Sequence, residues 1–492
     1  MRNQAVLPVP RAMPLTAKAM PVNTKLLGIV AGIMVAAMIW MIPIAGLPPS
    51  GQKALAITTF AVIWWVCGVT HPAYTTLLLF LGYILLLGPV TTPEGTTVDI
   101  ASQVFRLFSL PLMWLMVGAF LIATAVTRSG LATRVAYIFM TRFGKSYRGI
   151  VVLSYVLGFV LSFLIPHPFP RALLIMTMIG PMITAAQAHD QDAAALGFGV
   201  FAAATGTSMI VLMGDSVLNV AGVGFAKMPV GFFDWLTYMA VPGIVASLLM
   251  LGLHLVVFKQ HGTFVVDQER LAVARHQLGP MTRQEKVVLA WVGLALALWS
   301  TDGIHHIDPA WIALGVAVGL ALPYLGEILT PADLTSGVNW PIVVFVAGAL
   351  AIGNVGRATG MAQWLASTLL PATPPANPFV FAGMIGGVTM GLHMILGSAL
   401  ACMSVVSPPL VEYAARAGWS PLVPALLVYT AVNMHYLFPF HHVTMLLGAG
   451  EVGKYGSREV LKYGLPLTIV CLMVLMLVLV PWWMLIGLIP MP

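Results

Sequence analysis

The sequence predicts an all-α polytopic membrane protein that contains two inverted copies of one structural unit. Three observations carry this prediction. Hydrophobic residues make up 59% of the 492 residues and charged residues only 8%, a composition that a water-soluble globular protein could hardly bury. Apolar segments long enough to cross a bilayer recur along the chain. The order of intact and interrupted apolar segments also repeats in the second half.

Charge and cysteine content argue against other classes of protein. The formal net charge is +7, which we attribute to loops that set membrane topology rather than to a nucleic-acid surface, so no nucleic-acid partner is expected. Cys67, Cys402 and Cys471 all lie in apolar segments without CxxC spacing. A disulfide framework or a thiolate-bound metal is therefore not expected.

The chain divides into a tail, a first helix and two repeats. Residues 1–24 are predicted to be a cytoplasmic tail. Residues 25–50 are predicted to be an uncleaved transmembrane helix, because their apolar segment is as long as a full span. The first repeat covers 51–258, a polar cytoplasmic linker covers 259–286, and the second repeat covers 287–492. The intact apolar segments lie at about 25–46, 53–70, 73–90, 110–127, 235–258, 287–301, 309–326, 338–356 and 460–488.

A proline cluster interrupts the apolar segment 149–187 in the first repeat. Its members are Pro166, Pro168 and Pro170. Because proline lacks an N–H group and fixes φ, residues 166–170 are predicted to be extended, and a helix restarts near Pro170. A re-entrant hairpin that turns back inside the membrane fits this pattern.

The other interrupted segments give each repeat the same two special elements. A broken helix is predicted at 193–226, a second re-entrant hairpin at 378–418 and a second broken helix at 421–450. Irregular backbone at membrane depth is tolerated only where it is buried in protein or lines a wet cavity. The four interrupted segments are therefore the expected walls of a solute site near the midplane.

Residue matches support a duplication. The segment LMWLMVGAFLIATAVTRSGLATRVA, which starts at Leu112, aligns with IVVFVAGALAIGNVGRATGMAQWLA, which starts at Ile342. In this alignment Gly118 and Gly130 fall on Gly348 and Gly360. FFDWLTYMAVP, which ends at Pro242, likewise resembles SREVLKYGLP, which ends at Pro466.

Loop charges predict the relation between the two repeats. With the N-terminus inside and both hairpins treated as re-entrant, basic residues gather on the inside, and few remain outside. Those few are Lys53, Arg106, Lys227, Arg357 and Arg416. This bias requires about eleven transmembrane helices and repeats of opposite orientation, the architecture of a secondary transporter. The expected location is the plasma membrane, and a bacterial inner membrane in particular, with a cytoplasmic N-terminus.

Few ionisable residues remain at membrane depth. Arg171 is the one deeply placed cation; a guanidinium there needs a protein partner such as Asp215 or an anionic ligand. Asp215, next to Gly214, could bind sodium, carry a proton or cap a half-helix. The first hairpin and the first broken helix thus contain the candidate anion-binding residues His167, Phe169, Arg171 and Asn219. The candidate ion-coupling residues there are Asp215 and Gly214.

The second hairpin and the second broken helix contain the remaining candidate site residues. Gly397, Ser398 and Ala399 form a small-residue tip where backbone can approach a ligand or an ion closely, or where helices simply pack tightly. His441 and His442 lie at the predicted break, where they could donate to an anion or titrate. Adjacent histidines point to different sides of a helix, so no metal site is expected.

These motifs resemble the divalent anion/sodium symporter family, which includes dicarboxylate, citrate and sulfate transporters. FLIPHPFPRALLI resembles the first hairpin motif of the family, PSNTAR, with Pro166 and Arg171 at its ends and His167, Pro168 and Phe169 in its three central positions. HMILGSAL resembles the second motif, HLLFGSAT, with His393, Gly397, Ser398 and Ala399 matching and Leu400 in place of threonine. GDSVLN and the segment from Leu437 resemble the two broken helices of the family.

The resemblance implies an elevator-type secondary transporter, often a homodimer, with anion and cation sites at the hairpin tips. The expected substrate is a small divalent or multivalent anion, a dicarboxylate or tricarboxylate rather than sulfate. Coupling to Na⁺, to H⁺ or to counter-anion exchange stays open, and no other cofactor is expected. Loss of the hydroxyl groups at the first tip predicts weak or absent sodium dependence. The alternative from a different class is a membrane-embedded metalloenzyme that uses histidines and Asp215.

Overall fold

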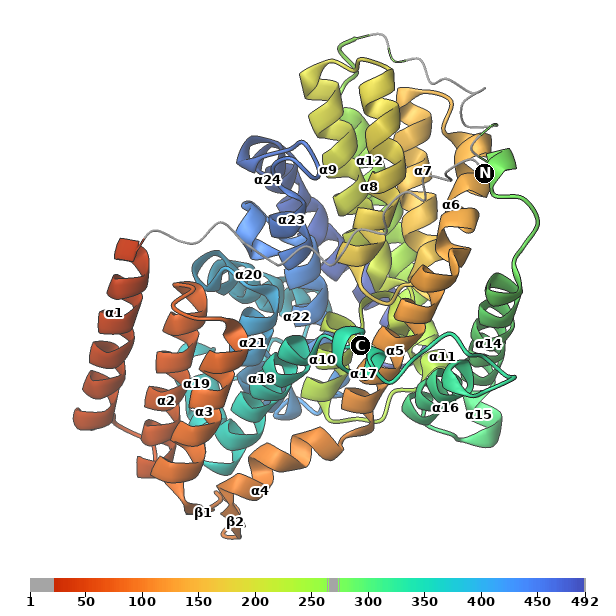
Figure 1. Ribbon diagram of the computed structural model, residues 1–492. Coiled ribbons are helices and arrows are strands. Elements are labelled where there is room, and N and C mark those ends of the chain that lie inside the picture. Colours follow the sequence, from red (N-terminus) through yellow and green to blue (C-terminus); the bar gives the residue numbers. More distant parts are fainter. Residues whose placement is uncertain (1–21, 263, 265–272, 274, 491–492) are drawn as a thin grey trace.

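The computed structural model describes residues 22–262, 264, 273 and 275–490. Most of the predicted tail 1–24 and the middle of the predicted linker 259–286 lie outside these residues. Figure 1 shows an almost entirely helical molecule, with a single short antiparallel hairpin of β1 (Pro89–Thr91) and β2 (Thr97–Asp99) in the described part.

Residues 22–257 form the first set of helices. These are α1 (Val22–Met41), α2 (Pro49–Val66), α3 (Pro72–Leu87), α4 (Ile100–Phe105), α5 (Pro111–Ser129), α6 (Leu131–Phe143), α7 (Tyr147–Val160), α8 (Pro168–Ala185), α9 (Asp190–Gly206), α10 (Leu218–Ala226), α11 (Phe232–Trp235) and α12 (Val241–Val257). Short 3₁₀ turns lie at Arg106–Ser109, Leu161–Phe163, Thr207–Met209 and Leu212–Asp215, and a π-helical turn at Leu236–Ala240.

Residues 283–485 form the second set. These are α14 (Arg283–Ser300), α15 (Asp302–His305), α16 (Pro309–Ala321), α17 (Asp333–Ser336), α18 (Trp340–Ala358), α19 (Met361–Leu369), α20 (Pro378–Leu396), α21 (Ala399–Ala415), α22 (Leu422–Met434), α23 (Val443–Gly448), α24 (Ser457–Val474) and α25 (Val480–Leu485). A 3₁₀ turn lies at Pro439–His441 and a π-helical turn at Leu475–Leu479.

The fold class is confirmed: the protein is an all-α polytopic membrane protein. Five of the described helices are long and apolar enough to cross a membrane, and six shorter apolar helices accompany them. The expectation was about eleven full spans. Three of the six shorter helices, α7, α21 and α22, begin or end at a hairpin tip or a break.

Helix α8 begins earlier than the prolines predicted. Residues 166–170 were expected to be extended, but α8 starts at Pro168, and His167 caps it. The first N–H groups of a helix have no intrahelical partner, so prolines in the first turn cost no hydrogen bond. Pro168 and Pro170 are therefore both compatible with the first turn of α8. The turn of the hairpin consists of residues 164–167, fewer residues than predicted.

The two sets of helices interlock. In Figure 1, α1–α3 lie on one side and α14–α16 on the other. Helix α3 packs on α18 of the second set, and α16 packs on α5 of the first. A Cβ atom on Gly118 would lie 2.8 Å from Ala313, and one on Gly348 would lie 2.4 Å from Thr76. The glycines matched in sequence thus mark equivalent helix crossings.

The second matched pair of glycines also has one structural role. Gly130 (φ 81°) separates α5 from α6, and Gly360 (φ 75°) separates α18 from α19. Left-handed backbone of this kind favours glycine, because other residues are strained there. Equivalent turns and equivalent crossings at matched positions support an internal duplication.

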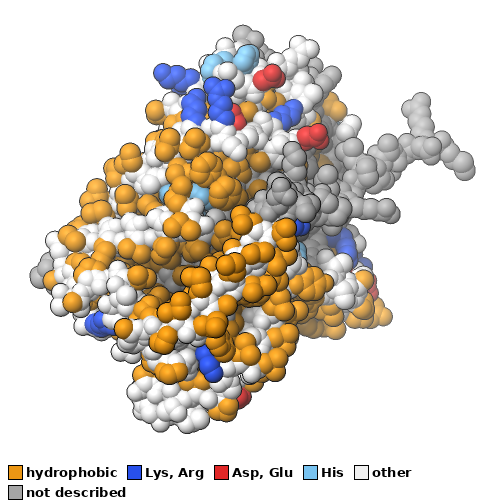
Figure 2. Space-filling model, turned by 90° about the vertical axis from the view of Figure 1, so that its left-hand side faces the viewer, with side chains coloured by type: hydrophobic (Ala, Val, Ile, Leu, Met, Phe, Trp, Pro, Cys, Tyr) orange, Lys and Arg blue, Asp and Glu red, His pale blue; other side chains and the backbone are white. Residues whose placement is uncertain are grey.

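One face of the molecule is largely apolar. Figure 2 shows hydrophobic side chains over most of one face, whereas Lys, Arg, Asp, Glu and His side chains gather toward its upper end. Exposed large apolar residues include Leu85, Leu248, Ile469 and Leu485. Lipid tails can solvate such a surface, and water cannot do so without cost.

An ion pair between α5 and α17 predicts a pH dependence of stability. The Arg128 guanidinium donates to both carboxylate oxygens of Asp333, and Thr330 donates to the same carboxylate from its N–H (2.6 Å) and its hydroxyl (2.8 Å). Burial raises the pKa of Asp333, but these hydrogen bonds outweigh burial and hold the pKa below its ordinary value. Ionised Asp333 therefore stabilises the fold above the ordinary carboxyl pKa of about 3.9, and this contribution is lost as the pH falls through the lower folded pKa.

We expect Asp333→Asn to lower the melting temperature of detergent-solubilised protein at pH 7 and to lower it progressively less as the pH falls below about 4. The measurement is thermal unfolding of both proteins across that pH range. Glu94→Gln, on the exposed turn between β1 and β2, is the control. A difference between wild type and Asp333→Asn that does not change with pH would contradict the assignment.

Candidate functional site

Two hairpin tips and two helix breaks meet inside the molecule. The tips are residues 164–167, between α7 and α8, and residues 397–398, between α20 and α21. The breaks are residues 207–217, between α9 and α10, and residues 435–442, between α22 and α23. Helix α7 packs on α9, and α20 packs on α22, so each tip lies beside the break of its own half.

Arg171 braces the first tip against the first break. Its guanidinium donates to the carbonyl oxygens of Ile165 (3.0 Å), Gly214 (3.0 Å) and Ala204 (2.6 Å), which belong to the tip, the break and the last turn of α9. The side chain is fully buried. The guanidinium is therefore bonded to three backbone carbonyl oxygens.

Asp215 does not neutralise the charge of Arg171 by direct contact. In the described part of the chain it forms no ion pair with Arg171, although the two groups interact electrostatically. Its carboxylate accepts hydrogen bonds from the N–H groups of Val217 (2.9 Å) and Leu218 (3.1 Å). Among the roles considered from sequence, the structure shows the capping of a half-helix.

All four helices that restart at the tips and breaks are capped by predicted site residues. His167 caps α8, Asp215 caps the start of α10, Ser398 caps α21, and His442 caps α23. In each histidine cap, Nδ1 accepts from a backbone N–H group two residues later: Phe169 for His167 (3.2 Å) and Thr444 for His442 (3.3 Å). The site therefore gathers four positive ends of helix dipoles.

Asn219 stabilises the backbone of the first break through side-chain hydrogen bonds. Its Nδ2 donates to the carbonyl oxygens of Ser208, Val211 and Leu212 at 3.0 to 3.1 Å. Its Oδ1 and the Ser216 hydroxyl are buried without a hydrogen-bond partner in the structure. Gly214 allows the chain to double back, because a Cβ there would lie 2.3 Å from the Ser208 carbonyl oxygen. Gly214 also gives its own carbonyl oxygen to Arg171.

The second tip is built from small residues, as expected. Gly397 adopts φ 61° at the end of α20, and the Ser398 hydroxyl accepts a long hydrogen bond from the Ala401 N–H (3.5 Å). A Cβ on Gly397 would lie 3.1 Å from the ring of Phe440. Gly397 and Ser398 are half-buried, whereas Ala399 is buried. This tip is therefore partly accessible beside the second break.

Three histidine rings cluster behind the second tip. The ring centroids of His393, His435 and His441 lie 5.0 to 5.8 Å apart. His393 Nε2 is 3.1 Å from the carbonyl oxygen of His441, so it donates, and Nδ1 of the same ring accepts from His435 Nδ1 at 3.4 Å. His441 Nδ1 accepts from the Leu437 N–H (3.2 Å), so its hydrogen is on Nε2, which is buried without a partner.

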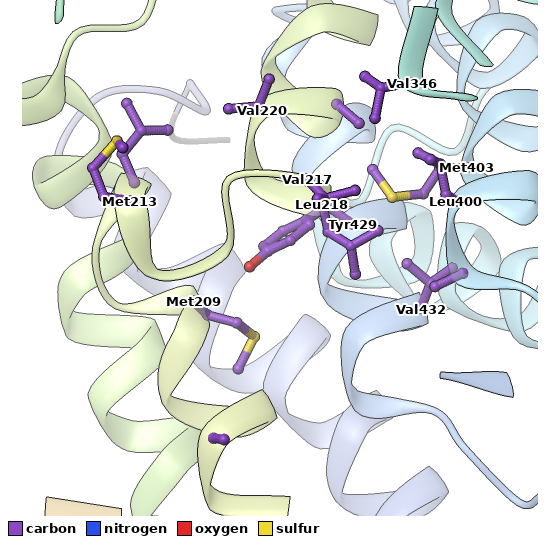
Figure 3. Packing of buried hydrophobic residues seen from close by; sticks show 14 of the residues in the cluster. Met209, Met213, Val217, Leu218, Val220, Val346, Leu400, Met403, Tyr429 and Val432 are labelled. Carbon is purple, nitrogen blue, oxygen red and sulfur yellow. The ribbon is translucent and has the colours of Figure 1, made fainter. Parts of the chain in front are cut away.

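The two halves meet across the second break. His442 interacts electrostatically with Asp215 and with His167 of the first half. Asn433 Nδ2 on α22 donates to the Ser208 hydroxyl (3.4 Å) and to the Tyr429 hydroxyl (3.2 Å). Figure 3 shows Tyr429 reaching from α22 toward the first break, among the apolar side chains of α21 and α22.

The structure thus brings most of the predicted residues to one region. His167 and Phe169 are half-buried at the first tip, and His441 and His442 are buried between the tips. Sequence reasoning missed Asn433, Tyr429 and Phe440. An amide inside the apolar segment VYTAVNM was a usable signal for Asn433. In the described residues no group of three His, Cys, Asp or Glu side chains is placed to hold a metal ion.

Comparison with known proteins decides the class. Residues 23–489 match the family described as the sodium:sulfate symporter transmembrane region. The chain belongs to the sodium:sulfate symporter family. Membership confirms the resemblance drawn from the hairpin motifs, and it makes the protein a membrane transporter rather than an enzyme.

Relatives of the sodium:sulfate symporter family match nearly the whole chain. Dicarboxylate transporter 1 of spinach chloroplasts is 24% identical, over 94% of this chain and 81% of the spinach protein. The sodium-dependent dicarboxylate transporter SdcS of Staphylococcus aureus (strain USA300) is 23% identical, over 88% of this chain and 86% of its own.

Two solved structures share the fold. The Alcanivorax borkumensis YdaH transporter superposes with a TM-score of 0.50 at 16% identity, covering 88% of this chain and 98% of its own. Neisseria gonorrhoeae MtrF, from a class of antimetabolite efflux pumps, gives a TM-score of 0.51 at 15% identity, covering 86% and 96%. At these identities the likeness concerns the fold alone.

Proposed function

We propose that this member of the sodium:sulfate symporter family exchanges small di- or tricarboxylates across the membrane, and that the two tips and two breaks bind the anion. The observation that carries the proposal is the meeting of four capped helix starts at the tips and breaks, where Arg171 adds a buried guanidinium that forms no ion pair in the described residues. Helix N-termini and a buried guanidinium both favour negative charge. The proposed contacts are His167, Phe169, Asn219, Ser398, Ala399, His441 and His442, with Arg171 acting through its charge.

The partly apolar surroundings favour carboxylates over sulfate. Phe169, in the first turn of α8, lies beside the half-buried His167, and the Phe440 ring of the second break lies beside the half-buried Gly397. An organic anion places its carbon skeleton against such rings, whereas sulfate has no apolar part to bury. The spinach and staphylococcal relatives carry dicarboxylate in their names, which points the same way.

The contacts of Arg171 favour exchange over sodium symport. Sodium sites of broken-helix transporters use backbone carbonyls that are freed at the breaks. Here a fixed cation already takes the carbonyls of Ile165, Ala204 and Gly214. At the second tip, imidazoles of His393 and His435 lie behind Gly397 and Ser398, and they offer nitrogen rather than oxygen. A counter-anion then drives transport, and the ion-coupling role expected of Asp215 and Gly214 becomes structural.

The wider arrangement of the transporter follows from the loop charges. We place the N-terminus in the cytoplasm of a bacterial cell, with the two repeats oppositely oriented in the inner membrane. The hairpins and broken helices then form a body that moves past α5 and α18 by an elevator-type motion. A homodimer is the proposed assembly.

The test is an uptake assay in proteoliposomes loaded with unlabelled succinate, citrate or sulfate. We expect labelled succinate or citrate to enter only vesicles that hold a carboxylate inside, at the same rate with and without an imposed sodium gradient. The exchange proposal is overturned by steep sodium-stimulated uptake into empty vesicles, which would match the name of the staphylococcal relative. Counterflow of sulfate alone would overturn the proposed substrate class.

A further inference from the structure

A cavity of about 420 Å³ lies next to the first break and is lined by none of the residues of the two hairpin tips. One wall consists of α5, the turn after α4, the start of α16 and α18, and the other consists of α10 and α21. None of the residues proposed to contact the transported anion lines it. Leu212 of the first break lines it. The cavity lies between two groups of helices that also contact each other directly, as α18 and α21 do.

Basic side chains dominate the charge of the cavity. Arg106, Lys227 and Arg357 line it, and they come from three different elements. The one lining carboxylate, Asp308, caps α16 by accepting from the Ala310 N–H (2.9 Å). The lining charge is thus three cations minus one carboxylate, or +2. Glu412, outside the lining, lies 3.8 Å from Arg357 and offsets part of this charge.

The rest of the cavity wall is mostly apolar, and it contains the amide side chain of Asn354. Leu112, Leu115, Val220 and Val223 contribute apolar side chains from α5 and α10. Asn354 of α18 lines the cavity, and its buried Oδ1 has no hydrogen-bond partner in the structure. Drug-sized ligands occupy pockets of about 300 to 1,000 Å³ that combine apolar walls with a few polar groups. This cavity has that size and that combination.

We infer that the cavity binds an amphipathic carboxylate, with an apolar body between α10 and α18 and its charged end near Arg106, Lys227 and Arg357. A small, strongly hydrated dicarboxylate would gain little from the apolar walls. An apolar body with one carboxylate uses both features. This ligand class differs from the proposed transported substrate.

Such a ligand would also restrain transport. It contacts α10 and α21 on one side and α5, α16 and α18 on the other. If these groups of helices move past each other during exchange, the bound ligand holds them in one arrangement. This consequence rests on the proposed function, whereas binding itself does not. The expected inhibition is non-competitive with the transported anion.

The test measures binding of 4-biphenylcarboxylate to the purified full-length protein by calorimetry, with the neutral 4-biphenylcarboxamide as the matched ligand. We expect the carboxylate to bind at least about tenfold more tightly than the amide, a preference that salt weakens. Lys227→Gln and Arg357→Gln should each reduce this preference. Val230→Trp, which fills the cavity from the segment after α10, should abolish binding of both ligands.

Controls separate this site from the transport site. Arg148→Gln, an exposed residue of α7, should bind both ligands as wild type does, and saturating succinate should not displace the carboxylate. Equal affinity for acid and amide would overturn the inference, as would binding that survives Val230→Trp. Displacement by succinate, or binding of phosphatidylglycerol in place of the carboxylate, would also overturn it. These results do not depend on whether the protein exchanges anions, because each arm measures binding.

Discussion

Replacement of Arg171 by alanine is expected to reduce succinate or citrate exchange by at least about 100-fold. Hydrogen bonds to charged groups contribute about 1.5 to 3 kcal/mol each, and three carbonyl oxygens lose their donor in this variant. The first tip is then released from the first break, and the region loses its deeply placed positive charge. The measurement is exchange in proteoliposomes, together with gel filtration and thermal unfolding in detergent.

Two further substitutions distinguish the role of the Arg171 hydrogen bonds from the role of its positive charge. Arg171→Lys keeps a cation but cannot reach three carbonyl oxygens with a planar fork, so we expect intermediate exchange. Arg171→Met keeps much of the volume and removes the charge, and we expect it to match alanine in exchange while unfolding at a higher temperature. Arg148→Gln is the control. Exchange at the wild-type rate by a folded Arg171→Ala protein would remove Arg171 from the site.

Replacement of Gly214 by alanine is expected to abolish exchange and to lower the melting temperature. The added Cβ would lie 2.3 Å from the carbonyl oxygen of Ser208, and backbone at a closed break cannot move aside as a flexible side chain can. Overpacking of this kind costs about 1 to 3 kcal/mol. Any displacement of Gly214 also moves the carbonyl that Arg171 holds.

Gly222 provides the matched control in the same part of the chain. It lies within α10, and a Cβ there would meet Tyr429 Cβ at 3.4 Å, an ordinary contact distance. Because alanine favours helix over glycine, Gly222→Ala should leave exchange intact and stability unchanged or slightly higher. Equal effects of the two substitutions would show that the close approach of Gly214 to Ser208 is unimportant.

The sequence was sufficient for the parts of the fold that local chemistry controls. Pro166, Pro168 and Pro170 lack N–H groups and fix φ, so a turn of the first hairpin near these residues could be predicted, although α8 starts at Pro168 and not after an extended 166–170 segment. Gly130 and Gly360 marked two equivalent turns, because left-handed backbone favours glycine at both. Composition alone established that the protein spans a membrane.

The parts that sequence could not predict depend on contacts between distant segments. The local sequence around Arg171 does not show that its guanidinium donates to the carbonyl oxygens of Ala204 and Gly214. Both residues are more than thirty positions away. The clustering of His393 with His435 likewise depends on how α20 packs on α22. A buried guanidinium takes acceptors that the fold supplies, so its backbone partners could not be predicted from the local sequence.

Substrate protection of single cysteines tests most directly whether both hairpin tips bind one anion. Phe169→Cys and Ser398→Cys are made separately in a Cys67→Ser background, because Cys402 and Cys471 are fully buried. Glu94→Cys serves as the control. Maleimide labelling is followed at low temperature with and without succinate or citrate. We predict that the carboxylate slows labelling at both tips and leaves residue 94 unchanged. Protection at one tip only, or at neither, would contradict a shared anion site.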